Sequence, residues 1–129
     1  MNGSRLLDSN LVIAYLENER IVVQRAIAAD EVLVPVVALG ELQYGAGSSS
    51  RVEENLNRIE SFLQWAKVIT CDERTAEIYG TIKQQLRAAG RMIPDNDIWI
   101  AAASRQTSVT LASRDQHFAN VENLDWEIW

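Results

Sequence analysis

Residues 5–12 read Arg-Leu-Leu-Asp-Ser-Asn-Leu-Val, two apolar runs separated by three polar residues. The run from Arg5 to Leu7 predicts a short strand, because it is brief, apolar and closed by a polar residue. Ser9 predicts the N-cap of a helix that continues to Leu16. Asp8 therefore lies between a strand and a helix, beside apolar segments where an ionised carboxylate is costly.

The same alternation of short strands and longer helices continues along the chain. Apolar periodicity predicts helices at 19–29, 36–44, 51–66, 72–89 and 95–104, and a short helical turn at 116–118. Short β-branched or apolar runs predict strands at 31–35, 67–70, 108–112 and 124–129. Strands separated by helices imply a mostly parallel sheet with helices on both faces. We therefore predict an α/β fold that forms one domain over residues 1–129.

Length and composition agree with one globular domain. A chain of 129 residues with 47% hydrophobic residues can bury a core but is too short for two domains. No apolar stretch is long enough to span a bilayer, and the first five residues lack the pattern of a signal peptide. The single cysteine, Cys71, excludes an internal disulfide and a cysteine zinc site. We expect a soluble, cytoplasmic protein.

The charge balance limits how the chain could bind nucleic acid. It has 18 acidic and 12 basic residues, a formal net charge of −6, which argues against a broad basic surface that coats nucleic acid. An acidic pocket can still engage phosphates through divalent cations. A nuclease is therefore compatible with the negative charge.

Four acidic residues lie in or beside strongly apolar segments: Asp8, Glu41, Asp97 and Asp115. In a parallel α/β fold ligands bind beyond the carboxyl ends of the strands, and Asp8 and Asp115 follow two predicted strands there. Carboxylate oxygens are the ligands that Mg²⁺ prefers, so the four acids predict one metal pocket holding one or two ions. Asp8, Asp97 and Asp115 are the expected direct ligands, and Glu41 either completes the shell or positions the attacking water.

Each acid also has a purely structural interpretation, which the sequence leaves open. Asp8 could cap the first helix together with Ser9. Asp97 could complement the dipole of its helix, although Asp95, predicted at the N-cap, competes for that role. Asp115 could cap the short turn that follows it. Glu41 is harder to explain in this way, because helical spacing places it on an apolar or small-residue face of its helix with residues 37, 38, 44 and 45.

The order of these motifs resembles a known family. The motifs are Leu-Leu-Asp-Ser-Asn at 6–10, Gly-Glu-Leu at 40–42, Pro-Asp-Asn-Asp-Ile-Trp-Ile-Ala-Ala at 94–102 and Leu-Ala-Ser-Arg-Asp-Gln-His-Phe at 111–118. Together they resemble the PIN-domain nucleases, and within them the VapC-type toxins of type II toxin–antitoxin pairs. The resemblance covers nearly the whole chain.

The resemblance implies a function and its residues. Asp8, Glu41, Asp97 and Asp115 match the acidic quartet of the family, which is expected to bind Mg²⁺, or alternatively Mn²⁺, and to cleave RNA. It also implies a homodimer and a small VapB-like antitoxin that covers the acidic pocket. Serine replaces the common threonine at positions 9 and 113, which preserves the hydroxyl, and Asp95 leaves open which aspartate of that motif touches the metal.

Two other classes of protein would also place acids in such a fold. A receiver-like signalling module has an acidic magnesium pocket, but it needs a lysine near the end of its last core strand, and neither Lys67 nor Lys83 lies there. An inactive binding protein could use the acids only as helix caps.

Three further polar residues lie near the acidic motifs. His117, the only histidine, lies in a polar turn and is expected at the surface and not as a general base. Arg91 and Arg114 lie near the motifs and are candidates for phosphate contacts.

Overall fold

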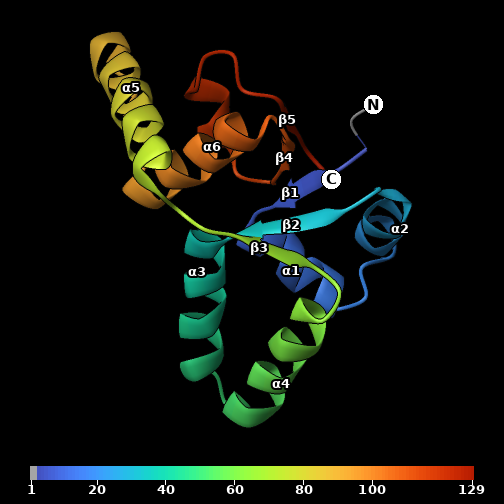
Figure 1. Cartoon of the computed structure of the whole chain (residues 1–129). Helices are drawn as coiled ribbons and strands as arrows, with labels where there is room; N and C mark the ends of the chain where they lie inside the picture. Colours follow the sequence, from blue (N-terminus) through green and yellow to red (C-terminus); the bar gives the residue numbers. More distant parts are fainter. Residues whose placement is uncertain (1–2) are drawn as a thin grey trace.

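A five-stranded parallel sheet forms the centre of the protein in the computed structural model, which describes residues 3–129 (Figure 1). Met1 and Asn2, part of the N-terminal segment assessed for a signal peptide, lie outside the described residues. The strand order is β3-β2-β1-β4-β5, and all neighbours are parallel. The strands are β1 (Arg5–Leu7), β2 (Val32–Pro35), β3 (Lys67–Ile69), β4 (Thr110–Ala112) and β5 (Trp126–Glu127).

Helices cover both faces of this sheet, as predicted. In Figure 1, α5 and α6 lie above the sheet, whereas α1, α3 and α4 lie below it. The α-helices are α1 (Ser9–Leu16), α2 (Arg20–Ala28), α3 (Val36–Gly47), α4 (Val52–Leu63), α5 (Glu73–Ala89) and α6 (Asp95–Thr107). A short 3-10 helix, η1 (Gln116–Asn120), follows β4. None of the helices in residues 3–129 combines the length and apolar character needed to cross a membrane.

The buried apolar residues form one cluster around the sheet. All four residues of β2 are buried, which fits a central strand covered on both faces. Helix α6 is buried along most of its length, because Ile98, Ile100 and residues 101–104 have no exposed face. The unbroken apolar run at residues 98–103 is the part of the chain that forms this interior helix.

Several predicted boundaries were wrong in detail. Helix α4 ends at Leu63 and not at residue 66, and α6 continues to Thr107 and not only to residue 104. Helix α3 continues beyond its predicted end at residue 44, through Gly45 and Gly47, and ends before Ser48. The N-cap of α1 is Asp8, whose side chain accepts a hydrogen bond from the backbone N–H of Ser9. Strands β4 and β5 start at Thr110 and Trp126, two residues later than predicted. Ser108, predicted as the first residue of β4, instead ends α6 with φ +57°. None of these differences changes the order of the elements.

The end of α5 offers a test of the fold. Gly90 closes the helix with φ +66°, whereas Gly80 lies inside the same helix, and an added Cβ would meet nothing within 4 Å at either position. We expect Gly90→Ala to lower the free energy of unfolding by about 1 kcal/mol, because alanine is strained in the left-handed region. Gly80→Ala is expected to raise it by about 0.5–1 kcal/mol, because alanine restricts the unfolded chain. Urea denaturation measures both, and a loss of stability in both variants would contradict this assignment.

Candidate metal centre

Strand register places Asp8 beside Ser113 at the carboxyl end of the sheet. Leu7, the last residue of β1, pairs with Ala112, the last residue of β4. The residues that follow the two strands, Asp8 and Ser113, therefore lie side by side. The hydroxyl of Ser113 donates to Oδ2 of Asp8 over 2.7 Å, and the backbone N–H of Ser9 donates to Oδ1 over 2.8 Å. Both carboxylate oxygens are thus held in place. This point lies at the switch between β1 and β4, where ligands bind in open α/β sheets.

Burial makes a charge on Asp8 costly. The residue is 3% exposed, and this burial raises the pKa of its carboxyl despite the hydrogen bonds from Ser113 and Ser9, which lower it. The charges of Glu41 and Asp115 raise the pKa of Asp8 further. A helix cap needs neither this depth nor these neighbours. Asp8 is therefore both the N-cap of α1 and a member of an acidic cluster.

Asp97 reaches the same cluster from the first turn of α6. It is 7% exposed, and burial raises the pKa of its carboxyl to about 6. The hydrogen bond from His117 lowers this pKa, whereas the nearby charges of Asp115 and Asp8 raise it. The charges of three aspartates therefore act on one another at this end of the sheet.

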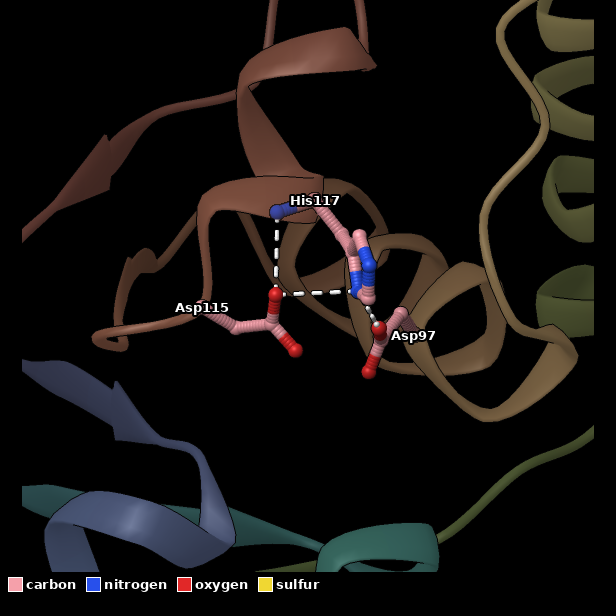
Figure 2. Close-up of side chains that lie close together, drawn as sticks. All are labelled: Asp97, Asp115 and His117. Atoms are coloured by element: carbon pink, nitrogen blue, oxygen red, sulfur yellow. Dashed lines mark hydrogen bonds and ion pairs between the residues drawn. The ribbon is translucent and has the colours of Figure 1, made fainter.

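Asp115 and His117 approach Asp97 from the turn after β4. Asp115 caps η1, because one of its side-chain oxygens, Oδ1, accepts the backbone N–H of His117 over 2.9 Å. The imidazole Nδ1 of His117 lies 2.9 Å from Oδ1 of Asp115 and 2.9 Å from Oδ2 of Asp97 (Figure 2). The hydrogen bond to Asp97 is the main cause that raises the pKa of His117. His117 is half exposed, as predicted, but its ring faces the acids.

Glu41 lies in α3 next to these residues. Its Oε1 accepts the hydroxyl of Ser9 over 3.1 Å, and its Oε2 accepts the side-chain N–H of Asn96 over 3.4 Å. Glu41 is half-buried, and Tyr44, predicted on the same apolar face, is 79% exposed. The prediction that Glu41 lies on an apolar face of its helix was therefore only partly correct. The contact with Ser9, the neighbour of Asp8, places the glutamate at the edge of the cluster.

Two neighbouring residues are engaged elsewhere. Asp95 is the first residue of α6 and not its N-cap, which is Pro94. Its Oδ1 accepts hydrogen bonds from the hydroxyl of Tyr79 over 2.9 Å and from Nζ of Lys83 over 3.0 Å. Of the two candidate arginines, Arg114 directs its guanidinium to Glu19, with nitrogen–oxygen distances of 3.1 and 2.5 Å. Asp95 is therefore turned away from the four acids, and Arg114 is committed to an ion pair.

The donor atoms of this cluster fit a divalent cation. One ligand atom from each of Asp97, Asp115 and His117 lies within 4.8 Å of the other two. The charge of Asp8 acts on Asp97, and the charge of Glu41 acts on Asp8, so both carboxylates lie near this group. Hard divalent cations prefer such oxygen-rich sets. An ion would offset both the burial and the repulsion between acids that together raise the pKa values of Asp8 and Asp97.

Comparison with known proteins agrees with this geometry. The model of the PIN domain family matches residues 5–124. Ribonuclease VapC2 of Haemophilus influenzae is 32% identical over 127 residues, which cover 96% of each chain. The tRNA(fMet)-specific endonuclease VapC of Shigella flexneri is 29% identical and is covered to 96%. The solved structure of VapBC-1 from nontypeable Haemophilus influenzae superposes with a TM-score of 0.88 at 26% identity, covering 98% of both chains. The chain therefore belongs to the PIN-domain family and, within it, to the VapC ribonucleases.

Proposed function

We propose that this chain is a metal-dependent endoribonuclease that hydrolyses RNA phosphodiester bonds and acts as the translation-inhibiting toxin of a toxin–antitoxin pair. The observation that carries this proposal is the convergence of Asp8, Asp97 and Asp115, with Glu41 at their edge, at the carboxyl ends of β1 and β4. The relatives are named as ribonucleases or as a tRNA-specific endonuclease, which supports RNA as the substrate.

The residues of the cluster have different proposed roles. Asp8, Asp97 and Asp115 are the proposed metal ligands, and Glu41 completes the shell or positions the attacking water. Ser113 holds the Asp8 carboxylate in one orientation through its hydroxyl. A bound Mg²⁺ or Mn²⁺ would activate water and stabilise negative charge on the scissile phosphate. Mg²⁺ is the expected ion for a set of carboxylates alone, and Mn²⁺ is the alternative.

The proposed partner is a small VapB-like antitoxin. VapBC-5 from Mycobacterium tuberculosis, whose structure this chain resembles with a TM-score of 0.76 at 25% identity, is named as a member of the VapBC family of toxin-antitoxin systems. The formal net charge of −6 favours an inhibitor that presents basic side chains to the acidic cluster. A homodimer and a cytoplasmic location remain predictions, and light scattering of the isolated chain tests the dimer.

A receiver-like signalling module is not favoured by the structure. Such a module would need a lysine beside the acidic pocket to contact a phosphoryl group. Lys83 lies in α5 and is paired with Asp95, and Lys67 lies exposed in β3, the edge strand farthest from β4. The two lysines of the chain are thus engaged or placed away from the four acids.

RNA cleavage in the absence and presence of metal tests the proposal. We expect no cleavage of a mixed tRNA substrate after treatment with EDTA, and cleavage after addition of Mg²⁺ or Mn²⁺, because the acids alone cannot activate water. Gel electrophoresis of the RNA gives the rate. Asp8→Asn, purified in the same way, controls for contaminating nucleases. Equal cleavage in EDTA and in metal, or by both proteins, would overturn the proposal.

A further inference from the structure

We propose that His117 is a metal ligand through Nδ1 and that this nitrogen makes the site prefer a first-row transition-metal ion such as Mn²⁺ over Mg²⁺. The inference rests on the proposed function and deepens it, because it assigns a further residue and a metal preference to the same site. The carboxylates alone would not distinguish these ions in this way.

The distances within the cluster match those between ligands of one ion. Two ligands about 2.1 Å from an octahedral ion and at right angles to each other lie about 3.0 Å apart. Nδ1 of His117 lies 2.9 Å from Oδ2 of Asp97 and 2.9 Å from Oδ1 of Asp115. Figure 2 shows the imidazole with this nitrogen directed to both carboxylates. An ion can therefore bind all three atoms with only small side-chain movements.

The backbone holds the imidazole in this position. Asp115 caps η1 by accepting the N–H of His117, so the turn fixes the relative placement of the two residues. Phe118, the next residue, is 1% exposed and anchors the same turn in the core. The ring of His117 therefore extends from a turn that a capping hydrogen bond and a buried side chain hold in place.

The nitrogen changes which ions the cluster favours. Mg²⁺ prefers oxygen ligands and keeps several waters, so it gains little from an imidazole. First-row transition-metal ions accept imidazole readily, and their affinity for mixed nitrogen and oxygen sites rises from Mn²⁺ towards Cu²⁺. A set of two or more carboxylates and one imidazole therefore favours these ions over Mg²⁺.

The opposite role is also chemically consistent and makes a different prediction. A protonated imidazole between two carboxylates would act as an internal counter-ion that a metal must displace. Removing His117 would then strengthen metal binding. If His117 is a ligand, removing it weakens the binding of Mn²⁺. The sign of the change in affinity therefore separates the two roles.

Electron paramagnetic resonance with Mn²⁺ tests the inference on the full chain without a histidine tag. His117 is the only histidine, so a modulation of the bound Mn²⁺ signal by imidazole nitrogen can come only from this residue. We expect this modulation in the wild-type protein and its change on labelling histidine with ¹⁵N. We expect it to disappear in His117→Ala.

Metal affinities give the second measurement. His117→Ala is expected to weaken Mn²⁺ binding about tenfold and to change Mg²⁺ binding much less. Titration with Mn²⁺ gives the first affinity, and competition of Mg²⁺ against bound Mn²⁺ gives the second. Gln116→Ala, an exposed neighbour in the same turn, should bind both ions as the wild type does. Bound Mn²⁺ without nitrogen modulation, or unchanged or tighter binding in His117→Ala, would overturn the inference and leave the proposed ribonuclease intact. Failure of Mn²⁺ and Mg²⁺ to bind the wild type would overturn both.

Discussion

Asp97→Asn is expected to reduce metal-dependent RNA cleavage about a thousandfold, because loss of a charged ligand removes several kcal/mol of charge stabilisation in the transition state. Asp97 is the buried acid that faces both Asp115 and His117. Asparagine keeps the size of the side chain but neither its charge nor its full capacity to bind a cation. Cleavage rates at saturating Mg²⁺ and Mn²⁺ measure the loss.

The same substitution is expected to stabilise the metal-free protein. Burial raises the pKa of Asp97 from 3.8 to about 6. The carboxyl of Asp97 therefore binds a proton more tightly in the folded protein than in the unfolded chain. The stability of the wild type should therefore fall as the pH rises from about 4 to about 6 and then level off. At pH 7.5 in EDTA, Asp97→Asn should unfold with a free energy about 1–3 kcal/mol higher than the wild type. Added Mn²⁺ should reduce or reverse this difference, because it stabilises only the protein that binds it.

Asp95→Asn is the matched control, because it makes the same change two residues earlier in α6. Asp95 pairs with Lys83 and Tyr79 at the surface and not with the acidic cluster. We expect this variant to keep most of its cleavage activity. The dependence of its stability on pH should be nearly the same as in the wild type. Equal loss of activity in both variants would contradict the assignment of Asp97 as the metal ligand of this motif.

The fold could be predicted from the sequence with few errors, because the patterns that indicate each helix and strand are local. Brief apolar runs and long amphipathic segments alternate, and each predicted helix and strand is present in the structure. The boundary of α3 was wrong because Gly45 and Gly47, which usually end helices, here lie in a helix whose Ala46 packs in the core. Packing of the helix outweighs the weak preference of glycine for turns.

The site was less predictable, because it depends on contacts between distant residues. The positions of Asp8 and Asp115 after strands predicted that they would meet, since parallel strands end at the same edge. His117 was placed at the surface, because a single histidine in a turn carries no periodic signal. Its spacing of two from Asp115 was the available clue, since a capping aspartate accepts the N–H of that residue. The distance to Asp97 required the packing of α6 against η1.

Ser113→Ala is expected to impair both the fold and the activity, because one hydroxyl organises several parts of the centre. The Ser113 side chain is fully buried, donates to Asp8, and accepts from the backbone N–H of Asp115 over 3.0 Å and from Asn10 over 3.3 Å. Alanine leaves these groups without that partner, which should lower the free energy of unfolding by about 1–3 kcal/mol. Metal affinity and cleavage should fall about 10- to 100-fold, because the carboxylate of Asp8 loses its orientation.

Ser113→Thr separates the role of the hydroxyl from that of the small side chain. Threonine keeps the oxygen that contacts Asp8 and Asp115 and adds a methyl group, so cleavage should stay within about threefold of the wild type if the hydroxyl is what matters. Urea denaturation in EDTA and Mn²⁺ titration measure stability and affinity for both variants. A Ser113→Ala protein that binds Mn²⁺ and cleaves RNA like the wild type would show that Asp8 needs no such support. Equal losses in both variants would instead assign the effect to packing around residue 113.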